Sequence, residues 1–452
     1  MTRPERRRAA ELNPHPWAAQ PLGRRQFLAA TVAACAGPCI LPARVLGRDG
    51  ATAPSERVTV GVIGLGGRGS GQVQTLLADN AAQLVAVCDV FASKAQAIKK
   101  SVEAHYAAQT GKGLYKDCAA YQDFRELLAR ADIDAVFIDS PENWHAVHAI
   151  MAMKAGKDVY CEKALCRTVV EGRAVCDTVR RTGRVFQAGT QQRSARNFRF
   201  ACELARNGYL GKLHTVIVGV PGGKKLPLLP AEPVPPDLDY ELWLGPAPYK
   251  PYRRVLCNHE WHYVSDYDAG YIATWGVHHV DIACWGAPSL HETTLNVEGT
   301  AVFPEEGTAD NSISWETKLT TPQGLALLHC SSDKSPRGGG CRFEGDKGWV
   351  HVDRGRLNAE PASLLDVVIR PGQERLYRSS NHQTNFLECV RSRRDPVSPV
   401  ESVYHATVAT LVADIATRLG RKLVWDWQKE RFLNDDTANR MLSRPMRAPW
   451  HI

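Results

Sequence analysis

The sequence lacks paired cysteines. Its 13 cysteines contain no C-x-x-C pair and are odd in number, so neither a zinc site nor a disulfide framework is predicted. Residues such as Cys88 and Cys161 lie in apolar stretches typical of strands, where a reduced thiol packs as a small apolar group. We therefore expect core cysteines and no metal.

The sequence also lacks a concentrated basic patch in its main part. The formal net charge is +8, but residues 1–50 contain eight arginines, no lysine and three acidic residues. Binding to nucleic acid needs clustered basic side chains with base-reading or stacking groups, and no such run follows residue 60. Nucleic acid is therefore not an expected partner.

A long uninterrupted apolar run is missing as well. In "LGRRQFLAATVAACAGPCILPARVLG" a twin arginine, Arg24 and Arg25, precedes an apolar stretch that Pro38 interrupts and Arg44 ends. A membrane span needs about 20 apolar residues, whereas this pattern is typical of a twin-arginine export signal. We expect an exported, periplasmic protein with no stable transmembrane span in its mature form. The "VAAC" stretch that ends at Cys35 leaves a lipid anchor open as an alternative.

What the sequence does contain is a nucleotide-binding pattern. In "RVTVGVIGLGGRGSGQVQTLLADNAAQLVAVCDV" a strand at 58–63, a glycine turn, a helix and a second strand at 84–89 follow one another. Glycines in this turn let the backbone approach a pyrophosphate at a helix N-terminus, and Asp89 ends the second strand where an acid binds the ribose hydroxyls. The residues of the turn expected to contact the dinucleotide are Gly64, Gly66, Gly67, Arg68 and Gly69.

The residues after Asp89 bear on the choice of cofactor. Val90 and Phe91 supply no cation for a 2′-phosphate, so NAD is favoured over NADP. Arg68, inside the glycine turn, could reach such a phosphate and keeps NADP open.

Strands and helices keep alternating to about residue 192, with helices expected at 92–108, 145–155 and 169–182. This alternation predicts an α/β fold with a doubly wound parallel sheet, whose ligand crevice lies at the carboxyl ends of its strands. Further cofactor-binding residues predicted at those ends are Pro141, Trp144, His145, Glu162, Lys163 and Gln191.

The second half of the chain indicates another domain. Alternating strands from "TTLNVEGTAVF" to "LDVVIR" predict a sheet, and a helix is expected at 401–419. We therefore divide the chain into a signal and linker (1–53), a nucleotide-binding domain (54–192) and a substrate and oligomerisation domain (193–452).

Three motifs together carry a resemblance to a known family. "SPENWHAVHAIMAMKAGK", "AGKDVYCEKAL" and "GVHHVD" resemble the glucose-fructose oxidoreductase, inositol dehydrogenase and rhizopine catabolism family (Gfo/Idh/MocA), over residues 57–452. The closing "FLNDDTANRMLSRPMRAPW" resembles its exported bacterial branch. The resemblance implies a second domain with a large open, mostly antiparallel sheet. It also implies NAD(P)-dependent chemistry on a sugar, polyol or sugar derivative, and a homo-oligomer, either a dimer or a tetramer.

The resemblance also implies roles for Lys163 and its neighbour. Lys163 matches the lysine of the family's E-K-P motif, near the nicotinamide and a substrate hydroxyl, where a cation would stabilise a developing alkoxide. Ala164 stands where the family has proline. A non-proline cis bond costs about 3 kcal/mol, so either this bond is trans and Lys163 is displaced, or the cis form is retained with strain.

His278 matches the histidine of the family's G-x-H-x-x-D pattern, and Asp281 lies one helical turn on. Histidine titrates near neutrality, so His278 is the expected acid and base, with Asp281 beside it. His279 points about 100° away and is assigned to packing. Many relatives have an aspartate four residues before this histidine; here that residue is Thr274. We therefore expect a proton relay that is shortened or supplied by others, with Tyr267, Asp268 and Tyr271 as candidates.

The segment "PGGKKLPLLPAEPVPPDLDYELWLGPAPYKPYRR" is dense in proline and is either an arm that contacts a neighbouring subunit or a surface loop. Aromatic rings after it, in "NHEWHYVSDYDAG", suit the apolar faces of a sugar. The predicted substrate-binding residues are Gln192, Arg193, Trp261, Tyr263, Tyr267 and His278.

Export narrows the functional alternatives. Because the space outside the cytoplasmic membrane has no dependable pool of free nicotinamide nucleotide, a folded passenger is expected to hold its NAD tightly. The first hypothesis is a sugar oxidoreductase in which Lys163 and His278 assist proton transfer, and dismutation between two sugars is one reaction that would reoxidise its NAD within a catalytic cycle. The alternatives are an NAD-dependent glycosidase that works by transient hydroxyl oxidation and elimination, distinct from the two-carboxylate route, and a non-catalytic sugar-binding protein.

Overall fold

The computed structural model describes residues 56–110 and 115–452. The predicted export signal, with Arg24, Arg25 and Cys35, lies outside the described residues. The described residues belong to one compact unit.

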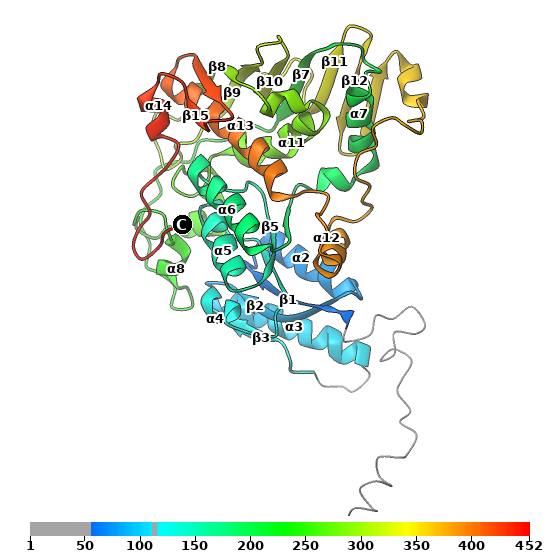
Figure 1. The fold of residues 1–452 in the computed structure, drawn as a ribbon. Coiled ribbons are helices and arrows are strands. Elements are labelled where there is room, and N and C mark those ends of the chain that lie inside the picture. The colour runs from blue at the N-terminus through cyan, green and yellow to red at the C-terminus, as the bar shows by residue number, and fades with distance from the viewer. Residues whose placement is uncertain (1–55, 111–114) are drawn as a thin grey trace, which may run out of the picture. The chain divides into compact units, whose positions relative to one another are not determined.

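The first part of this unit is a parallel sheet covered by helices (Figure 1). All neighbouring strands are parallel, in the order β3-β2-β1-β4-β5-β6. The strands are β1 (Val58–Ile63), β2 (Ala82–Cys88), β3 (Ala119–Tyr121), β4 (Ala135–Ile138), β5 (Asp158–Cys161) and β6 (Phe186–Ala188). The helices are α2 (Gly67–Ala78), α3 (Ala92–Thr110), α4 (Phe124–Leu128), α5 (Glu142–Lys154) and α6 (Val169–Thr182). This is the predicted doubly wound sheet, and its strand order reverses between β1 and β4, where a ligand crevice is expected.

Local sequence explains these strands. The AVFI of β4 is apolar throughout, the VTVGVI of β1 is apolar except for Thr59, and both strands are almost completely buried, as parallel strands with helices on both faces must be. The predicted bounds of β1 and α6 agree with the structure, and α3 and α5 differ from prediction by one to three residues at their ends.

The second part is a mixed, mostly antiparallel sheet in the order β13-β12-β11-β7-β10-β9-β8-β14-β15. Only the β7–β10 pairing within this sheet of the described chain is parallel. The strands are β7 (Leu213–Val220), β8 (Leu295–Val302), β9 (Ser314–Thr320), β10 (Ala326–Ser331), β11 (Gly340–Gly345), β12 (Gly348–Asp353), β13 (Arg356–Glu360), β14 (Leu423–Asp426) and β15 (Arg431–Phe432). The predicted fold class is thereby confirmed.

Two helices join the two sheets. The helix α11 (Gly276–Gly286) packs on β7 and β11, and α13 (Val400–Leu419) packs on α11, on β8 and on α6 of the first part. Buried apolar side chains form one continuous cluster through this region, from Ile138 and Trp144 to Val216 and Ala409. The shared core fixes the crevice between the two sheets.

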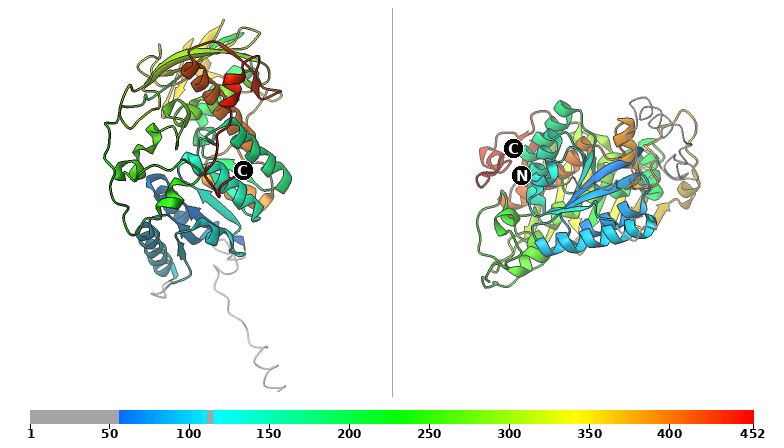
Figure 2. Two further views of the ribbon diagram at one scale, coloured as in Figure 1. Left: turned by 90° about the vertical axis from the view of Figure 1, so that its left-hand side faces the viewer. Right: turned by 90° about the horizontal axis from the view of Figure 1, so that it is seen from below.

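The proline-rich segment packs on the nucleotide-binding part of its own chain. Ala92 donates a backbone hydrogen bond to Asp237 (2.9 Å), and Asp239 donates one to Val90 (2.9 Å). Phe91 and Leu238 form an isolated bridge between these bonds. Figure 2 shows this stretch, in green, running from the upper sheet to the first helices. The segment includes α8 (Tyr240–Leu244), and two short helices follow at its end, α9 (Arg254–Asn258) and the 3-10 helix η4 (Glu260–Tyr263). Together they cover one side of the crevice.

The structure also bears on the cysteines, on membrane-spanning helices and on metal ligands. The eleven cysteines of the described residues are buried and none is in a disulfide. Within residues 56–110 and 115–452, no helix is long and apolar enough to cross a membrane, and no three His, Cys, Asp or Glu side chains are placed to hold a metal ion.

The glycines of α2 provide a matched test of this fold. A Cβ added at Gly69 would lie 1.8 Å from the Gly64 carbonyl oxygen, whereas one added at Gly71 meets nothing within 4 Å. We expect Gly69→Ala to lower the free energy of unfolding by about 1–3 kcal/mol, because the β1–α2 turn must open. Gly71→Ala should raise it by about 0.5–1 kcal/mol through helix propensity. Denaturation of the two variants side by side measures this, and equal stabilities would contradict the close approach.

Candidate active site

The glycine turn forms one wall of a cavity at the end of β1. Gly64 has φ +91°, and a Cβ there would lie 2.6 Å from the Asp139 carbonyl carbon, so only glycine fits. Gly66 and Gly67, by contrast, face open space, with Gly66 as the N-cap of α2. This combination leaves room for a phosphate at the positive end of a helix.

Asp89 lies at the other end of the same cavity. Its Oδ2 accepts a hydrogen bond from the Leu65 amide (2.7 Å), and its Oδ1 accepts one from the Phe91 amide (2.9 Å). Burial raises the pKa of Asp89, and these two amides oppose that rise. The carboxylate is therefore fixed in place, and each oxygen keeps a lone pair for a ribose hydroxyl.

Arg68 turns away from Asp89. Its Nε donates to Glu162 Oε1 at 2.6 Å, so the guanidinium is engaged at the end of β5 and not at the ribose end. The cation that does line the cavity near Asp89 is Lys94, whose Nζ lies 4.2 Å from the centroid of the Phe91 ring. Lys94 was not predicted, because it lies one helical turn beyond the strand end.

The dinucleotide cavity has a volume of about 720 Å³. The predicted residues Gly64, Gly66, Asp89, Pro141 and Trp144 line it. The proline-rich segment and the short helices after it contribute the opposite wall, with Leu242, Trp243, Cys257, Asn258 and Trp261. These five were not predicted as cofactor-binding residues, because contacts between the segment and the crevice depend on tertiary packing.

A second cavity, of about 800 Å³, adjoins the first. Asp139, Ser140 and Trp261 line both. The other residues that line the second cavity are Arg68, His145, Glu162, Lys163, Gln191, His259, His262, Tyr271, Thr274, Trp275, His278 and Arg354. The two cavities therefore meet at the end of β4, as a cofactor site and a substrate site must.

Lys163 and His278 are brought together at this second cavity, as predicted. The Lys163 ammonium donates to the Thr274 carbonyl oxygen at 3.1 Å. Burial lowers the pKa of Lys163 from its usual value, and the carboxyl groups of Glu162 and Asp268 oppose this. The Lys163–Ala164 peptide bond is cis, the second of the two alternatives considered for this sequence.

His278 is held as a neutral imidazole. Burial lowers its pKa well below the usual value, and the positive charges of Lys163 and Arg354 lower it further. Its Nδ1 is buried without a hydrogen-bond partner in the described part of the chain. A neutral, unengaged ring is able to accept a proton.

The predicted pairing of Asp281 with His278 is wrong. Both Asp281 oxygens are taken by Arg193, with Nε to Oδ2 at 2.7 Å and Nη2 to Oδ1 at 2.8 Å. Asp281 has no exposed surface, and the guanidinium also stacks over Trp285, 4.8 Å from the ring centroid. A buried carboxylate needs a partner, and the nearest one comes from the segment after β6. Asp281 and Arg193 therefore form a structural ion pair, and Arg193 is not free to bind substrate.

Three other predicted substrate residues lie outside the cavity. Tyr263 and Tyr267 belong to an apolar cluster with Trp243, and Gln192 is 3% exposed. Of the two aromatic residues flanking His262, only Trp261 lines the cavity. Among the predicted cofactor residues, His145 hydrogen bonds through its ring to the Ala164 (2.5 Å) and Ser140 (2.8 Å) carbonyl oxygens, so it positions the Lys163 loop. His279 is buried beside Phe198, as expected for packing.

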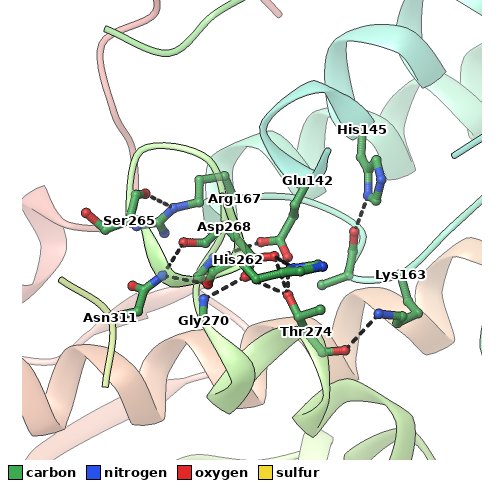
Figure 3. A network of polar contacts seen from close by, with 12 residues as sticks. Glu142, His145, Lys163, Arg167, His262, Ser265, Asp268, Gly270, Thr274 and Asn311 are labelled. Carbon is green, nitrogen blue, oxygen red and sulfur yellow. Dashed lines mark hydrogen bonds and ion pairs between the residues drawn. The ribbon is translucent and has the colours of Figure 1, made fainter. Parts of the chain in front are cut away.

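Thr274 connects two buried carboxyl groups (Figure 3). Its Oγ1 lies 2.6 Å from Asp268 Oδ1 and 2.9 Å from Glu142 Oε2. A hydroxyl has one proton and cannot donate to both. Burial and the nearby Asp268 raise the pKa of Glu142 well above its usual value, so Glu142 holds the proton that it shares with Thr274, and Thr274 donates to Asp268.

Asp268 in turn holds His262. The His262 Nδ1 lies 2.6 Å from Asp268 Oδ2, and the Gly270 amide donates to Oδ1 at 2.6 Å. Burial raises the pKa of Asp268, but His262 and Thr274 outweigh this and keep the pKa below its usual value. Asp268 is one of the three relay candidates expected from the sequence. Glu142 was missed, because it precedes Asp268 by more than a hundred residues.

Family models match both parts of the chain. One described as oxidoreductase family, NAD-binding Rossmann fold, matches residues 58–190. Another, described as oxidoreductase family, C-terminal alpha/beta domain, matches residues 222–452. The prediction that NAD is the cofactor is confirmed by the first match.

Individual relatives match over shorter stretches. The chain is 32% identical to a glycosyl hydrolase family 109 protein of Shewanella pealeana over 161 residues, 35% of this chain and 34% of that one. It is 32% identical to D-glucoside 3-dehydrogenase of Escherichia coli over 149 residues, 32% of this chain and 39% of that one. The chain thus spans about a third to two fifths of the length of these relatives.

A solved structure agrees over a longer stretch. Aldose-aldose oxidoreductase from Caulobacter crescentus, complexed with glycerol, has a TM-score of 0.57 to this chain at 19% identity. The agreement covers 81% of this chain and 99% of that one. At this identity it shows a shared fold.

The position of Thr274 can be tested by returning an aspartate to it. Thr274→Asp would put a third carboxyl group beside Glu142 and Asp268, so we expect the unfolding free energy near neutral pH to fall by about 2–4 kcal/mol. Thr274→Ser keeps the hydroxyl and should cost only about 1 kcal/mol. Chemical denaturation compares the two variants. An aspartate variant as stable as the serine variant would contradict the close placement of Glu142 and Asp268 beside residue 274.

The raised pKa of Glu142 predicts how the stability of the protein depends on pH. Because its folded-state pKa is raised, its contribution to stability is fully present below its unfolded value near 4.5 and is lost as pH rises toward the folded value. Glu142→Gln has no such loss. The stability of the variant relative to wild type should therefore increase from pH 5 to pH 8, by at most about 1.4 kcal/mol per pH unit. Urea denaturation over this range measures the difference, which would be flat if Glu142 were ionised in the folded protein.

Proposed function

Because the chain belongs to the Gfo/Idh/MocA oxidoreductase family, we propose that it transfers a hydride between NAD and a hydroxyl-bearing carbon of a sugar, polyol or sugar derivative. The observation that carries this proposal is the meeting of two cavities. One has the features of a dinucleotide site, and the other contains Lys163 and a neutral His278.

The residues of the second cavity suit removal of a hydroxyl proton. A sugar hydroxyl beside the Lys163 ammonium would be acidified, because the cation stabilises the alkoxide that develops. His278, kept neutral by burial and by Lys163, accepts the proton as the hydride leaves carbon. Bound NAD supplies the hydride acceptor. In the reverse direction the same ring returns the proton.

The proline-rich segment supports a tightly held cofactor. It closes one wall of the dinucleotide cavity with Leu242 and Trp243, and Trp144 Nε1 ties that wall to α5 by donating to the Leu242 carbonyl oxygen at 2.9 Å. A cofactor retained in this way suits a protein that folds before export. Export by the twin-arginine route and assembly into a homo-oligomer stay predictions from the sequence.

A second candidate function is redox-neutral cleavage of a glycoside, in which the oxidised sugar eliminates its substituent and is then reduced again. Similarity to a glycosyl hydrolase family 109 protein supports it. So does the presence of His262 in the same cavity in addition to His278, because elimination needs one more proton transfer than oxidation does.

The roles of Lys163 and His278 can be tested by near-isosteric replacement. We expect Lys163→Met and His278→Asn to keep NAD bound through purification and to slow its reduction by sugars by about 10²–10⁴-fold. Absorbance at the NADH band during a single turnover measures this, with cofactor content determined after denaturation. Lys422→Met, which alters an exposed ion pair, and His214→Asn, at an exposed position, are the matched controls. Near-normal reduction in either site variant would overturn the assignment.

A further inference from the structure

The second cavity contains more proton-transfer groups than an oxidation requires. Lys163 and His278 suffice for a hydroxyl proton, yet His262 lines the same cavity. It comes from η4, whereas His278 comes from α11, so the two rings approach the cavity from different elements. Figure 3 shows His262, Thr274 and Lys163 within one group of polar side chains.

His262 is oriented by a buried carboxylate. Its Nδ1 faces Asp268 Oδ2 at 2.6 Å, and Asp268 has no exposed surface. Nδ1 therefore carries the hydrogen, and Nε2 is the nitrogen able to accept a proton. The Trp261 ring, 3.6 Å away centroid to centroid, packs along the imidazole. A carboxylate behind an imidazole fixes its tautomer and stabilises the imidazolium that forms on protonation.

Asp268 is itself held from two sides. Thr274 Oγ1 lies within 2.7 Å of both of its oxygens, and the Gly270 amide donates to Oδ1 at 2.6 Å. Thr274 thus donates a hydrogen bond to Asp268, the carboxylate that pairs with His262. Asp268 and His262 therefore form a second acid–base pair at the cavity, beside Lys163 and His278.

We propose that His262, positioned by Asp268, is the catalytic acid and base for the carbon adjacent to the one that is oxidised. This inference rests on the proposed hydride transfer. Once the hydroxyl-bearing carbon has become a carbonyl, its neighbouring C–H bond is acidified. His262 Nε2 takes that proton, and the electron pair of the C–H bond forms the double bond of an enolate, whose oxygen lies opposite the Lys163 ammonium.

The same pair would complete an elimination. When the next carbon bears the glycosidic oxygen, the enolate electrons reform the carbonyl and a carbon–carbon double bond, and the C–O bond breaks with its electron pair on oxygen. The leaving oxygen takes the proton from the His262 imidazolium. Water then adds across the double bond, bound NADH would supply the hydride that reduces the carbonyl again, and His278 returns the proton to its oxygen. The cycle is redox-neutral and consumes only water.

Deuterium exchange separates this step from hydride transfer. The holoprotein is incubated in D2O with methyl and 4-nitrophenyl glycosides, and deuterium in recovered glycoside is measured beside the single-turnover reduction of bound NAD. We expect wild type to exchange the hydrogen next to the oxidised carbon. In His262→Asn the ratio of exchange to NAD reduction should fall by about 100-fold or more. His214→Asn, a histidine change outside the cavity, should keep the wild-type ratio.

Chemical rescue distinguishes catalysis from a structural role. Added imidazole should restore exchange to His262→Ala in a saturable manner. It should not restore exchange to Asp268→Asn, because the His262 ring still occupies its place in that variant. Proportional loss of exchange and of NAD reduction in His262→Asn would overturn the inference, as would wild-type protein that reduces NAD without exchange. Those results leave the proposed oxidoreductase intact. If none of the glycosides reduced NAD in wild type, the proposed function would fall, and this inference with it.

Discussion

A carboxylate with no exposed surface needs hydrogen-bond partners inside the protein. Asp268 is such a carboxylate, and the residues around the second cavity are arranged to supply its partners. The imidazole of His262, the hydroxyl of Thr274 and the amide of Gly270 all point to it. His262 comes from η4, whereas Gly270 and Thr274 lie at the two ends of the next short helix, α10 (Tyr271–Thr274), so the two elements are drawn together at the edge of one cavity. Glu142 joins them as a neutral carboxyl group, because a second buried charge beside Asp268 would be repelled.

The cavity beside the glycine turn depends on a different constraint, the close approach of two backbone segments. Gly64 and Gly69 are needed because the turn after β1 packs directly on itself and on Asp139. Gly66 and Gly67 face space that a pyrophosphate can fill. The proline-rich segment then covers this space from the same chain, through two main-chain hydrogen bonds to the strand end after β2. Main-chain contacts thus position the segment that covers this space.

Much of the fold could be predicted because its signals are local. Apolar strands, glycine spacing and alternating helices specify the parallel sheet, whereas Lys163 and His278 come from the motifs that carry the family resemblance. The predictions that failed depend on where a side chain points. Asp281 lies on the same helix as His278, but its nearest partner, Arg193, comes from another segment. Likewise Tyr263 and Tyr267 flank the site in sequence and are turned into a separate apolar cluster.

By itself, the sequence determined the two-part α/β architecture and the dinucleotide turn with Asp89, because each is encoded within a few residues, by the period of apolar side chains or by backbone freedom at glycine. Lys163 and His278 were reached through the motifs that carry the family resemblance. Only the tertiary structure decided which carboxylate contacts which basic side chain. Carboxylate pairing is set by burial and by distance in space, so Asp281 is bound by Arg193, Asp268 is matched with His262, and Thr274 connects Glu142 to Asp268.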